Sequence, residues 1–276
     1  MASLYISSQT FSDFQEEVTE TWELDQEYNL IDVEYIGGRW TGVLADNGVN
    51  NANAVETAED PETLASEIQE RRDEGLDLID IEYIKDTWIA VFDDSSPFGG
   101  TAYNFSADSD ELVEETQEFF DAGYKLANVE YVEYADGYWV SIFDRSDGHS
   151  TLNRKDSLTG LEEAIETRKE EGFDLVGVEY AEETWVGVFK EAFFSSSAYS
   201  ITSDRGEFNQ SLEEFTEAGY DLIDFERVND QWIGVYEQKD PNFAELERTS
   251  DSGLRSNLRA IALTPAINIP TPGSYF

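Results

Sequence analysis

The sequence predicts a mainly β fold with one helix per repeat, in which five units form a ring that resembles a β-propeller. Three observations support this prediction. A stretch with one glutamate and one tryptophan recurs five times, as in "IEYIKDTWIAVF" (81–92) and "VEYAEETWVGVF" (178–189). The five tryptophans are spaced by 48, 51, 46 and 47 residues, a period typical of repeated supersecondary units. Each copy also contains a helical period followed by strand periods.

The repeats divide most of residues 1–251 into five units of about 47 residues. Their expected bounds are about 11–60, 61–108, 109–156, 157–204 and 205–251. A strand at 4–9, "LYISSQ", precedes them and is surplus. In a closed ring, such a strand completes the sheet at the other end of the chain and leaves fewer open edges. The alternatives are an open α+β repeat stack that the strand caps, or an assembly in which it pairs with a neighbouring molecule.

Each unit is expected to begin with a helix. In the second unit, Asp60 is a suitable N-cap and Pro61 suits the first helical position. Leu64 and Ile68 then recur at helical spacing. Four helices are expected to end at a glycine, because glycine adopts the left-handed conformation at little steric cost. These glycines are Gly75, Gly123, Gly172 and Gly219, whereas the first unit has Glu27 at this place.

Two strands follow each helix. In "LDLIDIEYI" (76–84), strict alternation predicts that Leu78, Asp80 and Glu82 share one face. The next strand begins at the tryptophan, and a small residue two positions later predicts close approach by backbone or by a neighbouring side chain. These small residues are Gly42, Ala90, Ser141, Gly187 and Gly234. A third, weaker strand is predicted at 101–108, 150–157, 197–204 and 243–251.

One segment carries a family resemblance. "LEEFTEAGYDLIDFERVNDQWIGVYEQ" (212–238) contains a helix, a glycine followed by an aromatic residue, and two strands. In this pattern it resembles the bacterial tandem-repeat domain found beside serine-hydrolase domains in some secreted enzymes. It is also similar to repeats in the tails of plant casein-kinase-like proteins. The resemblance covers roughly residues 11–250 without a catalytic motif, and it implies an accessory or binding module.

The chain is strongly acidic, with 61 acidic and 17 basic residues and a formal net charge of −44. Nucleic acid and anionic membranes are therefore not expected as partners, because both need a basic surface. The charge is interpreted as a means of solubility, including in a high-salt environment, and the alternative is a cation or a basic partner. The start lacks a signal peptide and no apolar run reaches the ~18 residues of a membrane helix, so a cytoplasmic protein without membrane insertion is expected.

The recurring glutamates form the candidate metal site. If the strands that carry them face the axis of a ring, five carboxylates converge, and like charges at close range require protons or a cation. Calcium is the expected cation because it prefers hard oxygen ligands, and no other cofactor is expected. The alternative is that these side chains face water or cap a turn. The glutamates are Glu34, Glu82, Glu130, Glu179 and Glu226.

The recurring tryptophans form a candidate carbohydrate site. An indole face beside a carboxylate can hold a sugar ring, and repeated units would make the binding multivalent. The alternative is one core tryptophan per unit, packed beneath the helix. The tryptophans are Trp40, Trp88, Trp139, Trp185 and Trp232.

The chain is not expected to be an enzyme. His149 is the only histidine and cysteine is absent, which excludes a histidine pair for a metal and a thiol nucleophile. "DRSDGHS" (144–150) brings Asp147, His149 and Ser150 together in sequence only, which is better explained by a polar turn than by a triad.

The tail at 252–276 contains no acidic residue and three of the six prolines. It is interpreted as an extended docking peptide or, alternatively, as a segment that wraps the acidic body of its own chain. The residues predicted to dock are Arg255, Arg259, Ile267, Ile269, Tyr275 and Phe276.

The first function we expect is therefore a non-enzymatic interaction or assembly module that joins a protein partner or its own copies through the tail or the surplus strand. The alternatives are a lectin-like carbohydrate-binding repeat protein and a calcium-binding repeat ring.

Overall fold

The architecture is taken from a computed structural model of the chain. The structure describes residues 3–24, 28–46, 53–94, 101–146, 148–192, 195–228 and 230–239. Several predictions lie outside the described residues: the helix end at Glu27, the strand at 243–251, and the docking residues Arg255, Arg259, Ile267, Ile269, Tyr275 and Phe276.

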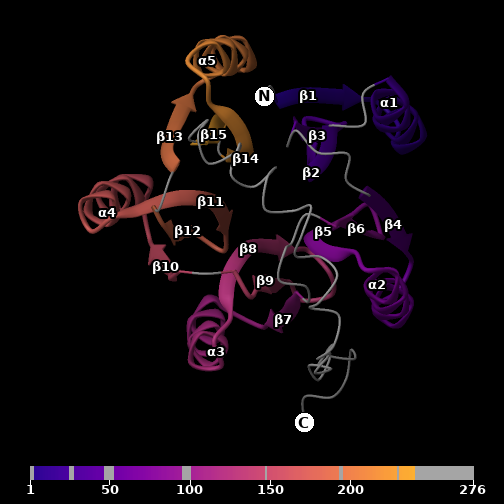
Figure 1. The fold of residues 1–276 in the computed structure, drawn as a ribbon, viewed down its shortest axis with the longest axis horizontal. Coiled ribbons are helices and arrows are strands. Elements are labelled where there is room, and N and C mark those ends of the chain that lie inside the picture. Colours follow the sequence, from indigo (N-terminus) through magenta and orange to yellow (C-terminus); the bar gives the residue numbers. More distant parts are fainter. Residues whose placement is uncertain are drawn as a thin grey trace, which may run out of the picture.

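Five units with the same strand-helix-strand-strand order make up the described chain (Figure 1). The first unit comprises β1 (Ser3–Ser8), α1 (Phe11–Leu24), β2 (Tyr28–Ile36) and β3 (Arg39–Asp46). The second comprises β4 (Asn53–Ala58), α2 (Pro61–Glu74), β5 (Asp77–Ile84) and β6 (Thr87–Asp93). The third comprises β7 (Ala102–Ser106), α3 (Ser109–Asp121), β8 (Lys125–Val132) and β9 (Tyr138–Asp144). The fourth comprises β10 (Ser150–Lys155), α4 (Leu158–Glu170), β11 (Phe173–Ala181) and β12 (Thr184–Glu191). The fifth comprises β13 (Ser195–Thr202), α5 (Arg205–Glu217), β14 (Asp221–Val228) and β15 (Gln231–Lys239).

Each unit forms its own three-stranded antiparallel sheet, and this changes the predicted phase of the repeat. The strand order in the first sheet is β1-β3-β2, with Ser8 opposite Trp40. The strand predicted at 4–9 is therefore not surplus, because it is the first strand of the first unit. Only two residues separate β1 from α1. This short link keeps β1 close to β2 and β3, the two strands that follow α1. The repeat consequently begins one strand earlier than the sequence predicts.

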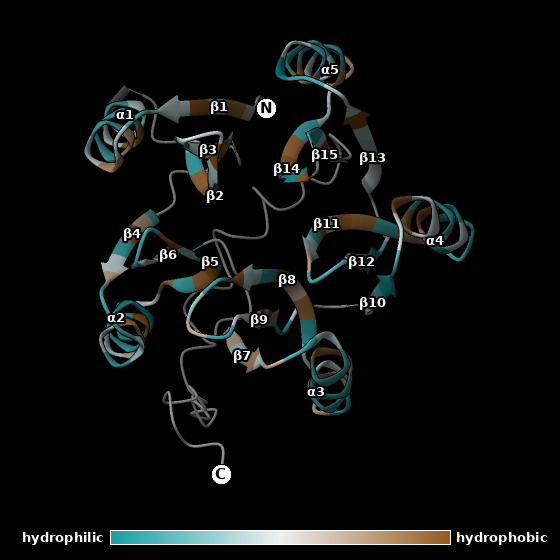
Figure 2. Ribbon diagram, turned by 180° about the vertical axis from the view of Figure 1, so that it is seen from behind, coloured by the Kyte–Doolittle hydropathy of each residue, from teal (hydrophilic) through white to brown (hydrophobic). Residues whose placement is uncertain are grey.

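The helix boundaries follow the predicted signals. The Asp60 side chain accepts a hydrogen bond from the Thr63 amide at 2.8 Å, and Pro61 is the first residue of α2. Gly75 ends α2 with a φ of 93°. The other three predicted glycines also have positive φ angles, which confirms their role at the helix ends: Gly123, Gly172 and Gly219. In Figure 2 the helices are largely hydrophilic, whereas hydrophobic segments concentrate on the strands.

A β-bulge interrupts the second strand of every unit, and it corrects the predicted alternation. In β5 the register shifts between Leu78 and Asp80, so that Leu78 pairs with Phe92 and Asp80 pairs with Val91. Because Ile79 is the extra residue, Leu78 moves to the side of the sheet that carries Phe92. The prediction that Leu78 shares a face with Asp80 and Glu82 is therefore wrong. The acidic residues lie on the opposite face.

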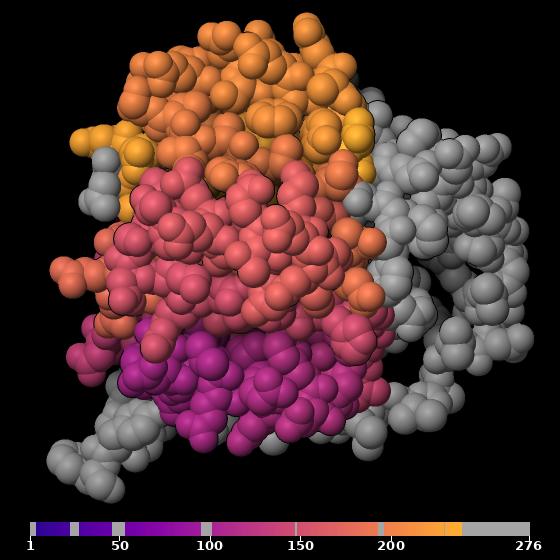
Figure 3. Space-filling view, turned by 90° about the vertical axis from the view of Figure 1, so that its left-hand side faces the viewer, coloured from indigo at the N-terminus to yellow at the C-terminus, as the bar shows by residue number. Residues whose placement is uncertain are grey.

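Hydrophobic clusters join each unit to the next. In one of them, Leu64, Ile68 and Trp88 of the second unit pack with Val140 and Ile142 of the third. Three further clusters join the first unit to the second, the third to the fourth and the fourth to the fifth. Figure 3 shows the fifth, fourth and third units in direct surface contact from top to bottom. A single unit therefore has an apolar face that a neighbouring copy covers, as the repeat predicts.

The fifth unit also packs against the first. Phe208 and Phe225 cluster with Ile36 and Val43 of the first unit. The ring centroid of Tyr5 lies 6.0 Å from that of Phe208 and 5.6 Å from that of Phe225. The first and last units are accordingly neighbours around a common centre (Figure 1).

A matched pair of glycines in the fourth unit tests the packing between helix and sheet. A Cβ atom at Gly187 would lie 2.9 Å from both Leu161 Cδ1 and Phe189 Cε2, whereas one at Gly177 would meet no atom closer than 3.7 Å. We expect Gly187→Ala to lower the free energy of unfolding by about 1–3 kcal/mol, because overpacking displaces its neighbours. We expect the control, Gly177→Ala, to change this free energy by less than about 0.5 kcal/mol. Urea unfolding measures both, and equal losses would contradict the account.

The described helices include none that is both long and apolar enough to cross a membrane.

Candidate functional site

The second strand of each unit lies nearest the centre of the molecule. It is an edge strand of its sheet, and β2, β5, β8, β11 and β14 contact one another in this order. Figure 1 shows these strands around the centre with the helices at the periphery. The recurring glutamates lie on these inner strands, on the face opposite the buried tryptophans. The repeat therefore brings five equivalent carboxylates towards one place.

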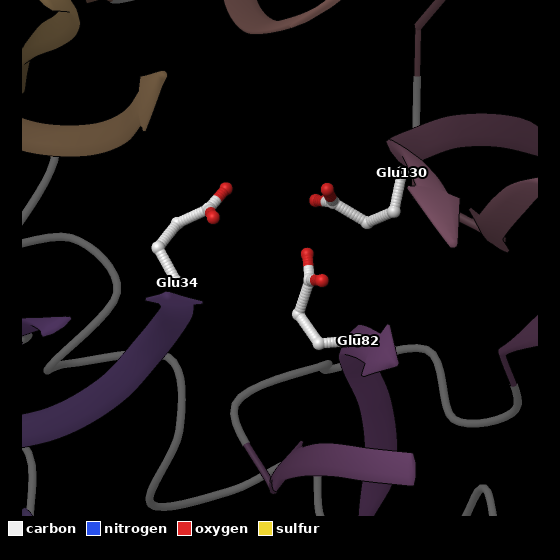
Figure 4. A group of neighbouring side chains, drawn as sticks. All are labelled: Glu34, Glu82 and Glu130. Atoms are coloured by element: carbon white, nitrogen blue, oxygen red, sulfur yellow. The ribbon is translucent and has the colours of Figure 1, made fainter. Parts of the chain in front are cut away.

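Three of these glutamates form a close group. Glu34, Glu82 and Glu130 each contribute one carboxylate oxygen, and the three oxygens lie within 4.8 Å of one another. Figure 4 shows their side chains pointing from three different units towards a shared point. We call this group the glutamate triad. Three carboxylates from separate units at this distance can share protons or can surround a small cation.

The remaining two glutamates lie beside the triad. Glu179 is buried and lies close enough to Glu226 for the two carboxyls to share a proton. Glu82 and Glu130 are close to each other in the same way. All five predicted glutamates are therefore brought together, and the alternative that they face water is wrong for the three buried ones: Glu82, Glu130 and Glu179.

Burial and mutual repulsion raise the pKa of these carboxyls. Burial is the larger cause for Glu34, whose pKa lies well above its ordinary value, and the charges of Glu82 and Glu226 add to the effect. The pKa values of Glu82, Glu130 and Glu179 are raised in the same direction, again chiefly by burial. Burial raises the pKa of Glu226 to about 8. Both effects act against the charged form, so the site favours any species that neutralises it.

A second set of positions, not predicted as a site from the sequence, lies two residues before each glutamate and carries a polar side chain in four of the five units. Residues two apart on a strand share a face, and the bulge lies before this pair and does not separate its members. The signal was present in the sequence, because three of the five units have an aspartate two residues before the glutamate. We call this set the aspartate tier: Asp32, Asp80, Asn128, Gly177 and Asp224.

Two aspartates of this tier bind backbone amides of the unit before them. Asp80 Oδ2 accepts a hydrogen bond from the Val33 amide at 3.1 Å, and its Oδ1 accepts one from the Ile81 amide at 2.9 Å. Asp224 Oδ2 accepts one from the Val178 amide at 2.7 Å. Burial nevertheless raises the pKa of Asp80 and of Asp224 to about 7 each. These two side chains tie neighbouring units together at the bulges.

The tier differs from unit to unit. Asn128 Oδ1 accepts a hydrogen bond from the Val129 amide at 2.8 Å, and its Nδ2 donates to Glu130 Oε1 at 2.7 Å. Gly177 contributes no side chain, and a Cβ there would lie 3.7 Å from both Asn128 Oδ1 and Asp224 Oδ2. The carboxylates of the tier therefore come from the first, second and fifth units only.

Asp32 differs from the other carboxylates of the tier. It is only 6% exposed, and its Oδ2 atom is buried with no hydrogen-bond partner. Burial raises its pKa well above the ordinary value, and the charges of Asp80, Asp224 and Glu82 raise it further. A buried oxygen without a donor is costly, so this position needs a proton or a cation.

No basic side chain neutralises the central carboxylates within the described part of the chain. The ion pairs of the described residues all involve other acids, such as Arg71 with Glu56 and Lys190 with Asp144. Eight carboxyl groups consequently gather at the centre without a counter-charge from any lysine or arginine that the structure describes.

The repeat tryptophans are core residues. All five are buried, with exposed fractions of 4%, 1%, 0%, 5% and 7% along the chain. Phe11 covers Trp40 with ring centroids 4.6 Å apart, and Phe208 stacks on Trp232 at 5.3 Å. The alternative interpretation as core is therefore confirmed, and the prediction that these indoles hold sugars is wrong because their faces are covered. The tryptophans are Trp40, Trp88, Trp139, Trp185 and Trp232.

Comparison of the chain with protein-family models, with curated proteins and with solved structures finds no match.

Proposed function

We propose that this protein binds calcium at its centre, through carboxylates that its repeats bring together. The observation that carries the proposal is the glutamate triad, whose three oxygens lie within 4.8 Å of one another. Two oxygens on opposite sides of a calcium ion are about 5 Å apart, because each calcium–oxygen bond is about 2.3–2.6 Å long. The triad of Glu34, Glu82 and Glu130 therefore fits around one ion with little movement.

The ligand chemistry favours calcium over magnesium. Calcium accepts six to eight oxygens in a flexible arrangement, whereas magnesium requires a near-octahedral shell and usually keeps several waters. Glutamate side chains can bind through one or both oxygens, so three of them can supply up to six ligand atoms. The charges of Glu179 and Glu226 act on Glu34 and would also stabilise an ion beside it.

Solvent access to the site supports the proposal. Glu82, Glu130 and Glu179 are buried, but Glu34 and Glu226 are partly exposed. These two belong to the first and fifth units, which are neighbours around the centre. An ion would reach the triad beside Glu34 and would lose its water progressively towards Glu82 and Glu130.

Calorimetric titration is the experiment that tests the function. In buffer stripped of metal at pH 7.5, we expect calcium to bind with measurable heat and to raise the melting temperature, because an ion that binds only the folded state stabilises it. Magnesium at the same concentration is the control and should have a smaller effect. A titration without heat, together with an unchanged melting temperature at millimolar calcium, would overturn the proposal.

The arrangement that we propose for this function is a closed five-bladed ring resembling a β-propeller. Four interfaces join successive units, and residues at one register position, such as Val55, Tyr103 and Tyr199, pack there on the preceding unit. Tyr5 holds the equivalent position, opposite Val43, and packs on the fifth unit. The contact between the fifth and first units thus uses the same position of the repeat as the four contacts between successive units.

Tyr5 provides a test of ring closure. We expect Tyr5→Ala to lower the free energy of unfolding by about 2–4 kcal/mol, because its ring packs against Phe208 and Phe225. Leu4 is the control, since it is adjacent in sequence and 39% exposed. Leu4→Ala should change the free energy by less than about 0.5 kcal/mol. If the units formed an open stack, Tyr5 would be free of the fifth unit and the two variants would behave alike.

The docking function predicted for the tail stays a prediction, because residues 252–276 lie outside the described part of the chain. Deletion of 252–276 followed by identification of co-purifying proteins tests it. An unchanged set of partners would contradict the docking role.

A further inference from the structure

Asp32 is a buried carboxylate at the centre that does not belong to the glutamate triad. The three oxygens within 4.8 Å of one another belong to Glu34, Glu82 and Glu130. Asp32 lies two residues before Glu34 on β2 and therefore one step along the strand from the triad. Its buried Oδ2 atom has no partner.

The pattern of cross-unit hydrogen bonds explains why this oxygen is free. Asp80 accepts the Val33 amide of the unit before it, and Asp224 accepts the Val178 amide in the same manner. The equivalent donor for Asp32 is the Phe225 amide of the fifth unit, but that amide binds Asp224 of its own unit. Asp32 therefore has one oxygen without a hydrogen bond, whereas the corresponding oxygens of Asp80 and Asp224 accept hydrogen bonds from backbone amides.

The surroundings of Asp32 are acidic on several sides. The groups that act on it most strongly are Asp80, Asp224, Glu82 and Glu226, and each of them is a carboxylate of the central cluster. Two of them, Asp224 and Glu226, come from the fifth unit and are partly exposed. A buried carboxylate whose charged form is opposed by other carboxylates is one that a hard cation stabilises.

We propose that the centre holds a second divalent cation, in the aspartate tier, with the buried Oδ2 atom of Asp32 as its principal ligand. This inference rests on the proposed calcium function. Charge balance supports it, because one divalent ion compensates only two of the eight carboxylates at the centre. A cation at this position would lie on β2, which contacts β14 of the fifth unit. Among the described residues, this junction lacks an aspartate–amide bond equivalent to those of Asp80 and Asp224, as do the two junctions of the third unit.

The stoichiometry of calcium binding tests the inference. We expect native mass spectrometry and calorimetry of the full chain to give two calcium ions per molecule for the wild type. Asp32→Asn keeps the shape of the side chain but removes its charge, and we expect this variant to bind one calcium ion. The control variant is Glu114→Gln, which also replaces a carboxylate by an amide of the same shape, but on the exposed side of α3. We expect it to bind two calcium ions.

Each outcome has a distinct meaning. One ion in both the wild type and Asp32→Asn would overturn the second site while leaving the proposed function intact, and Asp32 would then be a protonated core residue. No ion in the wild type would overturn the proposed function itself. If Asp32→Asn fails to fold, the stoichiometry of the wild type with terbium, read from its luminescence, decides between one ion and two.

Discussion

In the absence of calcium, the free energy of unfolding is expected to fall as the pH rises from about 5 to about 8. The direction follows from the raised pKa values at the centre. A carboxyl with a higher pKa in the folded state than in the unfolded state binds more protons when folded. Its contribution to stability is complete below the unfolded pKa and is lost as the pH rises through the folded pKa. For Asp80 and Asp224 the folded pKa is about 7, and for Glu226 it is about 8.

The expected size of this effect is large for a single site. Asp80 is fully buried, and its pKa changes from 3.8 to about 7 on folding. A change of this size corresponds to about 4 kcal/mol above pH 7, as an upper bound, because local relaxation and water reduce it. Several carboxyls shift in the same direction, so the calcium-free protein should melt at a distinctly lower temperature at pH 8 than at pH 5.

Thermal melting in a chelator across this pH range measures the effect. The same series with excess calcium is the control, and there the loss between pH 5 and pH 8 should become small, because the ion replaces the protons. A calcium-free protein whose stability rises steadily from pH 5 to pH 8 would contradict the assignment of the central carboxyls as buried and protonated.

Glu82→Gln is expected to have two large and opposite effects. In chelator at pH 8, the variant should be more stable than the wild type by about 2 kcal/mol, because a neutral amide replaces a buried carboxyl that must otherwise stay protonated or bear a charge. Its affinity for calcium should fall by about 100-fold or more, because one of three carboxylate ligands is lost. Melting in chelator and calorimetry with calcium measure the two effects.

Glu114→Gln serves as the matched control, since it makes the same chemical change at an exposed position of α3. Both properties should stay at their wild-type values in this variant. A Glu82→Gln variant that loses stability in chelator would show that Glu82 makes a favourable charged interaction in the folded protein, contrary to this account.

Much of the fold could be predicted from the sequence because its signals are local and repeated. The Asp60–Pro61 start and the Gly75 end of α2 depend on backbone conformations that few residues adopt. The small residue two positions after each tryptophan predicted a close approach, and Leu30 and Phe14 make it at Gly42. The fixed spacing between each tryptophan and this small residue favoured a core position for the tryptophans. That spacing alone did not exclude that they bind sugars.

The remainder depended on tertiary contacts that spacing does not reveal. Alternation placed Leu78 with Asp80, and the bulge at Ile79 reverses this without a local signal such as glycine. The pairing of β1 with β3 rather than with the fifth sheet could not be deduced from a repeat that reads equally well in either phase. The orphan oxygen of Asp32 depends on which carboxylate accepts the Phe225 amide, and the spacing of the repeat does not reveal this.

The most direct test of a calcium site at the centre is anomalous diffraction from crystals of the full chain grown with calcium, with a second data set from crystals soaked in a lanthanide. The account predicts an anomalous peak about 2.3–2.6 Å from oxygens of Glu34, Glu82 and Glu130. Carboxyl groups hydrogen-bonded to one another at saturating calcium, with no anomalous peak between them, would contradict it.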